Sequence, residues 1–170
     1  MRMVFDSSSI ILLAKISMLN IVAKNFECVI TKDVKKECTH KKDYQDAKII
    51  TRLINEGLLH VENINVAKNM EYEFRLGKGE ASSITLALKE KTVLATDDKA
   101  AIKACKIFGI GFVTSIDFVL RAFEKDKITS EEAKTKISKL DEYGRYSTEI
   151  IKNALETIGG KNEQSSKSQA

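Results

Sequence analysis

Short apolar runs alternate with longer helix-like segments through the first two thirds of the chain, and this alternation most constrains the fold. Parallel strands need long crossover connections, which are usually helices, so the alternation is typical of a parallel sheet covered by helices. The sequence therefore predicts an α/β fold in which a short parallel β-sheet is flanked by helices. The expected strands are residues 3–5, 27–30, 58–61, 92–95 and 111–113.

After the last expected strand, only the helical spacing of apolar residues remains. Val119 and Phe123 belong to one apolar stripe, and Ile151 lies on a second. Gly159 and Gly160 are expected to end the last helix. The expected regions are a sheet domain over 1–115, a C-terminal helical extension over 116–158 that packs on it or on a partner, and a disordered tail over 159–170.

Composition argues against several classes of protein. The longest uncharged run is ten residues, 107–116, whereas a membrane span needs about 20. Asp6 interrupts any apolar region of a secretion signal, so we expect neither a membrane protein nor a secreted one. The three cysteines have no CxxC spacing and are expected to be reduced thiols, which favours a cytoplasmic protein.

Histidine chemistry is also not expected. His40 and His60 are the only histidines, and they match neither a zinc-ligand pattern nor a recognisable catalytic triad motif. The formal net charge of +4 is mildly basic. This charge is compatible with a nucleic-acid partner but does not identify one.

Acidic residues stand where the predicted strands end. Asp6 directly follows the first strand, and Asp97 and Asp98 follow the fourth. Glu80 opens the helix that leads into the fourth strand, and Glu37 lies in the helix after the second. Ligands of open parallel sheets bind beyond the carboxyl ends of the strands, so we expect these carboxylates to lie around one edge of the sheet.

Two interpretations of these carboxylates remain open from spacing alone. Crowded carboxylates repel each other unless a cation compensates, and Mg²⁺ and Mn²⁺ prefer carboxylate and water ligands. Such ions can activate water and hold a phosphodiester for in-line hydrolysis. Alternatively, Glu80, Asp97 and Asp98 could cap helices, and Asp6, followed by serines, also suits an N-cap. Glu37, which follows two lysines, could lie on a solvated helix face.

Four stretches of the sequence occur in an informative order. They are Val4-Phe5-Asp6-Ser7-Ser8-Ser9-Ile10-Ile11, Glu37, Gly79-Glu80-Ala81-Ser82-Ser83-Ile84 and Leu94-Ala95-Thr96-Asp97-Asp98-Lys99. Together they resemble the PIN-domain family of metal-dependent nucleases, which includes VapC-type toxins. The resemblance covers residues 3–115. The Gly-x-Gly-Glu and Asp-Asp motifs are similar to those of a less characterised subgroup, in which a helical C-terminal extension is common.

The resemblance implies a PIN-like, Rossmannoid three-layer nuclease domain and gives roles to the acidic residues. Asp6 and Glu37 match the first two acidic residues of the family, and Glu80 stands where many members have aspartate. The Thr-x-Asp pattern of the family places the fourth carboxylate at Asp98, with Asp97 as an accessory group. The implied catalytic residues are Asp6, Glu37, Glu80 and Asp98, and the implied ligands of Mg²⁺ or Mn²⁺ are Asp6, Glu80, Asp97 and Asp98.

The implied function is a metal-dependent endoribonuclease that hydrolyses single-stranded RNA with a metal-activated water, and a toxin restrained by an antitoxin is one form of it. The alternative is a non-catalytic PIN-like module that binds RNA or protein. A phosphoacceptor receiver domain is disfavoured, because its acidic pair would follow the first strand. The expected partners are RNA, an antitoxin protein or a second copy of the chain, and the lysines expected to contact RNA are Lys35, Lys36, Lys78 and Lys99.

Overall fold

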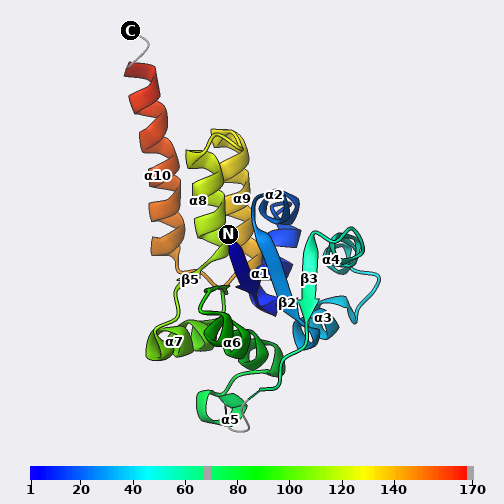
Figure 1. Cartoon of the computed structure of the whole chain (residues 1–170). Helices are drawn as coiled ribbons and strands as arrows, with labels where there is room; N and C mark the ends of the chain where they lie inside the picture. The colour runs from blue at the N-terminus through cyan, green and yellow to red at the C-terminus, as the bar shows by residue number, and fades with distance from the viewer. Residues whose placement is uncertain (67–69, 168–170) are drawn as a thin grey trace. The chain divides into compact units, whose positions relative to one another are not determined.

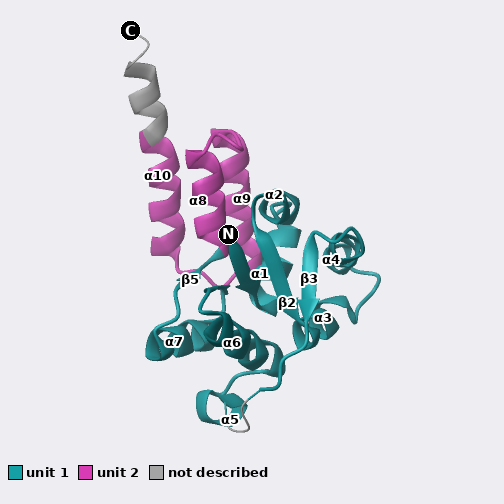
Figure 2. Ribbon diagram, viewed as in Figure 1, with its two compact units in different colours: residues 1–114 teal, residues 115–170 magenta. Residues whose placement is uncertain are grey.

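The computed structural model describes residues 1–66 and 70–167, and it divides into two compact units (Figures 1 and 2). The first unit, Met1–Thr114, contains the β-sheet and helices α1 to α7. The second unit, Ser115–Ala170, contains helices α8 to α10. The division falls directly after the last strand, where the sequence loses its strand pattern.

The sheet of the first unit has five described strands, all parallel, in the order β3-β2-β1-β4-β5. Val4 in the central strand pairs with Val29 on one side and Leu94 on the other. The α/β fold with a parallel sheet is therefore confirmed. The strands are β1 Arg2–Phe5, β2 Glu27–Thr31, β3 Leu59–Glu62, β4 Val93–Ala95 and β5 Phe112–Val113.

Seven described helices accompany the sheet in the first unit (Figure 1). Helix α6 packs against β1, β2 and β4, and it also contacts α3 and α7. Helix α1 packs against α2, α3 and α4. These helices are α1 Ser7–Lys15, α2 Leu19–Asn25, α3 Lys32–Thr39, α4 Gln45–Asn55, α5 Met70–Phe74, α6 Lys78–Glu90 and α7 Lys99–Phe108.

The core between α6 and the sheet fixes the ends of the central strands. Val4, Val29 and Leu94 come from three neighbouring strands and are fully buried. Ile84 of α6 and Ala101 of α7 belong to the same buried cluster. Burying side chains of this size stabilises the fold by about 1.5–3 kcal/mol each. The residues that directly follow β1 and β4, Asp6 and Thr96, are consequently positioned by this packed core.

Helices α1 and α2 together form an apolar stretch of the first unit. Among the residues that the structure describes, no single helix is long and apolar enough to cross a membrane. The α1–α2 pair passes that test only when both helices are counted together, and the pair is bent by 117°. Ile10, Leu13 and Leu19 of this pair are buried in the protein.

The second unit is helical, as expected for the region after the sheet. Its helices are α8 Ser115–Glu124, α9 Ser130–Tyr143 and α10 Thr148–Lys167, and each packs against the other two. Thr129 and Glu132 form a capping box that starts α9, because each side chain accepts a hydrogen bond from the other residue's backbone N–H. Ile137 and Leu140 of α9 are fully buried.

The expected end of the last helix is wrong. Helix α10 continues through Gly159 and Gly160 to Lys167, so the segment 159–167 is helical rather than a disordered tail. Neither glycine adopts the left-handed conformation that ends a helix, whereas Gly57 and Gly109 do, with φ of 72° and 67°. A glycine inside a helix costs only about 1 kcal/mol, which does not stop a helix that is already formed. Residues 168–170 lie outside the described part of the chain.

Candidate functional site

The candidate site lies at the carboxyl ends of β1 and β4, where the order of the strands along the chain reverses. Asp6 directly follows β1, and Thr96 directly follows β4. The Asp6 N–H donates to the Ala95 carbonyl at 3.1 Å, and the Ser9 hydroxyl donates to the same carbonyl at 2.7 Å. These bonds hold the two strand ends together at the position where open α/β sheets bind ligands.

Asp6 is fully buried at the centre of this site. Its Oδ1 accepts hydrogen bonds from the Ser8 hydroxyl at 2.8 Å and from the Ser9 N–H at 2.9 Å. Its Oδ2 accepts a bond from the Thr96 hydroxyl. Burial raises the pKa of Asp6 to about 6 in spite of these bonds, and the negative charge of Asp97 also contributes. A carboxylate in this environment gains stability from any nearby positive charge.

Ser8 and Thr96 connect Asp6 to the turn that follows β4, and neither was identified as a site residue from the sequence. The Ser8 hydroxyl donates to Asp6 and accepts the Asp97 N–H at 2.8 Å. The Thr96 hydroxyl donates to Asp6 and accepts the Asp98 N–H at 3.1 Å. The only sequence signal for them is a small hydroxyl residue beside each acidic motif.

Asp98 is both a helix cap and a member of the acidic group. Its Oδ1 accepts the N–H groups of Ala100 and Ala101 at 2.8 and 2.9 Å, which makes Asp98 the N-cap of α7. Capping by Asp98 is one of the two interpretations that the sequence left open, whereas the Thr96 hydroxyl donates to Asp6 instead of capping α7. The second carboxylate oxygen of Asp98 takes no part in the capping.

Glu37 reaches the site from α3, although the sequence around it also suits a solvated helix face. Its Oε1 accepts the Gly79 N–H at 2.9 Å, and its Oε2 accepts the Ser7 hydroxyl. A Cβ atom at position 79 would lie 2.8 Å from the Glu37 Cδ, which is closer than real Cβ contacts allow. The first glycine after Lys78 thus leaves space for the Glu37 carboxylate at the start of α6.

Glu80 lies in the first turn of α6, and its carboxylate interacts electrostatically with those of Glu37 and Asp98. Burial raises the pKa of the Glu80 carboxyl, and the negative charges of Glu37 and Asp98 raise it further. Within the described residues, no lysine or arginine lies within 4 Å of the carboxylates of Asp6, Glu37, Glu80 or Asp98 in an ion pair. Glu80, Glu37 and Asp98 are therefore close enough for their charges to interact, and among the described residues none of them forms an ion pair with a lysine or arginine.

The donor chemistry of this site fits a hard divalent cation. Carboxylate oxygens dominate it, and Mg²⁺ and Mn²⁺ prefer such ligands. Each carboxylate oxygen has two lone pairs, so Asp6 can accept hydrogen bonds and still contact a cation. In the part of the chain that the structure describes, no group of three or more His, Cys, Asp or Glu side chains converges closely enough to hold a metal ion. The carboxylates share one edge of the sheet without forming a closed cage.

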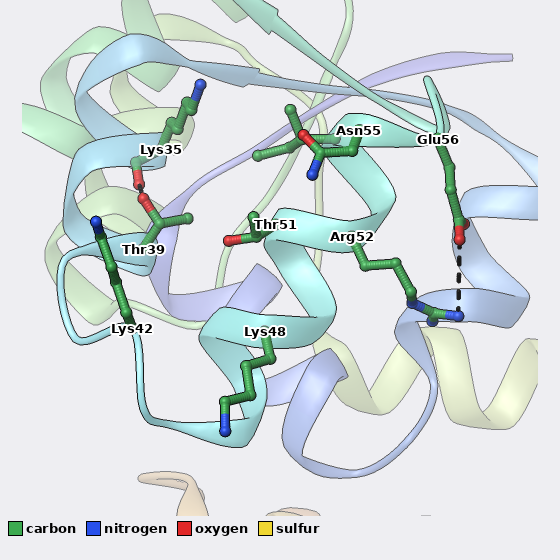
Figure 3. A pocket seen from close by; sticks show the side chains of 9 residues that line it. Lys35, Thr39, Lys42, Lys48, Thr51, Arg52, Asn55 and Glu56 are labelled. Atoms are coloured by element: carbon green, nitrogen blue, oxygen red, sulfur yellow. Dashed lines mark hydrogen bonds and ion pairs between the residues drawn. The ribbon is translucent and has the colours of Figure 1, made fainter.

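The four lysines that were expected to contact RNA are all exposed. Lys78 begins α6 two residues before Glu80, and Lys99 begins α7 directly after Asp98. Lys36 precedes Glu37 on α3. Lys35 instead lines a groove between α3 and α4 (Figure 3). Three of the lysines therefore neighbour acidic residues of the site in sequence, and the fourth belongs to a different surface.

Comparison with known proteins agrees with the sequence motifs. The family model DUF3368, described as a PIN domain, matches residues 2–160. None of the curated proteins matches the chain. A solved structure of a PilT N-terminus domain protein from the hyperthermophilic archaeon Sulfolobus solfataricus P2 is similar, with a TM-score of 0.52 and 19% identity over 73% of this chain and 95% of that one. That likeness supports the fold, and the family model covers both units. The chain belongs to the PIN-domain family.

Proposed function

We propose that the protein is a metal-dependent endoribonuclease that hydrolyses single-stranded RNA. PIN domains are typically nucleases and generally use divalent metals. The observation that carries the proposal is the placement of Asp6, Glu37, Glu80 and Asp98 at one sheet edge without a cationic partner among the described residues. Crowding and burial leave the negative charge of these carboxylates uncompensated, and a bound divalent cation would compensate it. The same ion could activate water for phosphodiester hydrolysis.

We propose the following roles for the residues of the site. Asp6, Glu80 and Asp98 would hold Mg²⁺ or Mn²⁺, with Asp97 beside them. When bound, such an ion supplies an activated water and stabilises negative charge on a phosphoryl oxygen. Ser8, Ser9 and Thr96 orient the Asp6 carboxylate. Glu37, held by the Ser7 hydroxyl and the Gly79 N–H, would accept a proton from the attacking water.

Attack by water is favoured over attack by a protein nucleophile. Cys38 directly follows Glu37 on α3, but burial raises the pKa of its thiol to about 12. Cys28 is also buried, and its pKa is likewise raised to about 12. Thiols with such pKa values are almost entirely protonated at neutral pH and are poor nucleophiles. A covalent intermediate is therefore not part of the proposal.

The second candidate is a PIN-like module that binds RNA or protein without cleaving it. It is favoured by the hydrogen bonds of the acidic group, because Asp6 and Asp98 cap helices and Glu37 binds the first turn of α6. These roles would preserve the carboxylates even without catalysis. The two candidates differ in whether a divalent metal has any effect on the protein.

Cleavage of a labelled single-stranded RNA tests the proposal. We expect cleavage to require Mg²⁺ or Mn²⁺, to stop with a chelator and to leave a 5′-phosphate and a 3′-hydroxyl. In the same buffer, metal at about a hundredfold excess over its Kd should stabilise the fold by about 2.7 kcal/mol. Cleavage that persists in chelator would contradict the mechanism. RNA binding without cleavage or metal stabilisation would favour the non-catalytic module.

Replacing Gly79 with alanine should separate catalysis from stability. The new Cβ would displace the Glu37 carboxylate, which is the end of a flexible side chain, so the backbone need not move. We expect the free energy of unfolding to change by less than about 1 kcal/mol. The cleavage rate should fall by about tenfold or more, because general-base catalysis typically contributes at least about a hundredfold.

A matched alanine substitution serves as the control for this variant. Gly159→Ala introduces a Cβ with nothing within 4 Å, inside α10. It should leave cleavage unchanged and stabilise the helix by up to about 1 kcal/mol. Unaltered cleavage in the Gly79→Ala variant would show that Glu37 has no part in the reaction.

A further inference from the structure

A basic groove of about 660 Å³ lies between α3 and α4, outside the acidic site (Figure 3). One wall carries Lys35, Thr39 and Lys42 from α3 and the turn that follows it, and the other wall is α4. We call it the α3–α4 groove. The residues that line it are Lys35, Thr39, Lys42, Lys48, Thr51, Arg52, Ile54, Asn55 and Glu56.

The charges of this groove are mostly uncompensated. Arg52 and Glu56 largely cancel each other, since the Arg52 Nη1 lies 3.9 Å from the Glu56 Oε1. Lys35, Lys42 and Lys48 are exposed and form no ion pair with any described carboxylate. Three ammonium groups that form no such ion pair therefore share one groove. Such a cluster attracts an anionic ligand.

The remaining lining residues favour a phosphate backbone over a nucleobase. The Thr39 hydroxyl already donates to the Lys35 carbonyl at 2.7 Å, so the neutral donors of the lining are the Thr51 hydroxyl and the Asn55 amide (Figure 3). Phosphate oxygens accept bonds from lysine, threonine and asparagine side chains. The lining contains no aromatic side chain on which a base could stack. The groove is therefore suited to repeated phosphates of any sequence.

Helix α3 lies between this groove and the acidic site, and opposite sides of the helix contribute residues to each. Lys35 and Thr39 are four residues apart, so they share one side of the helix, which faces α4. Glu37 lies on the opposite flank, where it contacts Ser7 and Gly79. Lys36 is exposed between the two flanks. A helix is about 10–12 Å wide with its side chains, so a flexible single strand can cross it.

We propose that the α3–α4 groove binds the phosphate backbone of single-stranded RNA whose neighbouring segment lies at the acidic site. This inference rests on the proposed ribonuclease function. It assigns the path that the bound RNA strand follows beyond the acidic site. The strand passes over Lys36 and then contacts Lys35, Lys42 and Lys48. An RNA long enough to reach the groove binds more tightly than one that fills the acidic site alone, and its binding is sequence-blind.

The test compares two double variants with the same change in net charge. Lys42→Gln with Lys48→Gln removes two groove cations, and Lys24→Gln with Lys89→Gln removes two exposed lysines on α2 and α6. Binding of labelled oligouridylates of increasing length is measured by fluorescence anisotropy in chelator, at several salt concentrations. We expect the groove variant to bind long RNA about tenfold more weakly than the control, with a salt slope lower by about 1.4. Short RNA should bind both variants equally.

Equal affinity and equal salt slope in the two variants would overturn the groove proposal. It would also be overturned if the groove variant lost affinity for a polyglutamate peptide while RNA binding stayed unchanged, since the groove would then serve an acidic protein. Because binding is measured without metal, its outcome does not depend on catalysis. If the protein cleaves RNA but the groove variant binds it normally, the groove proposal is wrong and the nuclease proposal stands. If binding depends on the groove but no RNA is cleaved, the nuclease proposal is wrong and the groove proposal stands.

Discussion

Replacing Asp6 with asparagine is expected to abolish RNA cleavage while making the metal-free protein more stable at neutral pH. The amide is nearly isosteric with the carboxylate and can still accept the Ser8 and Ser9 bonds at Oδ1. Its NH₂ group can donate to the Thr96 hydroxyl, which now donates to Asp6. The fold should therefore persist, while the anionic ligand at the centre of the site is lost. We expect the cleavage rate to fall at least about a hundredfold.

The pH dependence of stability gives this variant a second readout. The pKa of Asp6 is raised to about 6 in the folded protein, so the folded state binds the proton more tightly than the unfolded state. The wild-type chain should then lose stability as pH rises from about 4 to 6, by up to about 3 kcal/mol. The Asp6→Asn variant lacks this group and should show no such loss. Urea unfolding at several pH values in chelator measures the difference.

A matched substitution and metal addition complete the design. Asp141→Asn changes an exposed aspartate on α9 of the second unit and should keep both cleavage and the pH profile of the wild type. Divalent metal should restore the stability of the wild type at pH 7 and leave the Asp6→Asn variant unaffected. Wild-type cleavage rates in the Asp6→Asn variant would rule out Asp6 as a ligand in the reaction.

The fold was predictable because each level of the sequence points to the same answer. The short strands, the Thr31 cap of α3 and the left-handed glycines after α4 and α7 all appear where local chemistry places them. The end of α10 was not predictable in this way. Glycine is compatible with both a helix interior and a helix end, and local sequence does not decide between them at Gly159.

The candidate site was predictable in composition but not in geometry. The position of Asp6, Glu80 and Asp98 beside strand ends follows from the parallel topology alone. The bonds that organise them connect residues far apart in sequence, such as Thr96 to Asp6 and Ser8 to Asp97. Their existence depends on the register between β1 and β4, in which Phe5 pairs with Ala95. Glu37 likewise needed the packing of α3 on α6 before its contact with Gly79 could be known.

Arg2 is the residue whose loss should destabilise the first unit most among its charged side chains. Its guanidinium forms a bidentate pair with Glu90, at 2.7 Å from Nε and 3.1 Å from Nη2, and it also contacts Glu27 and Glu62. Arg2→Met keeps an apolar stem but leaves three carboxylates without their shared cation. Because the group is partly exposed, we expect a loss of about 2 kcal/mol at pH 7, between the values for surface and buried pairs.

Acid should remove this difference, which distinguishes electrostatics from packing. Arg2 lowers the pKa of Glu90, so the wild type holds this stabilisation above the ordinary glutamate pKa and loses it as pH falls through the lowered value. In the Arg2→Met variant the carboxylates repel each other, and protonating them restores stability. The urea unfolding curves of the two proteins should therefore converge below about pH 4. Arg2→Lys should lie between them at pH 7, since lysine keeps the charge but loses the bidentate geometry. A gap that stays constant down to pH 3 would mean that Arg2 stabilises the fold by packing.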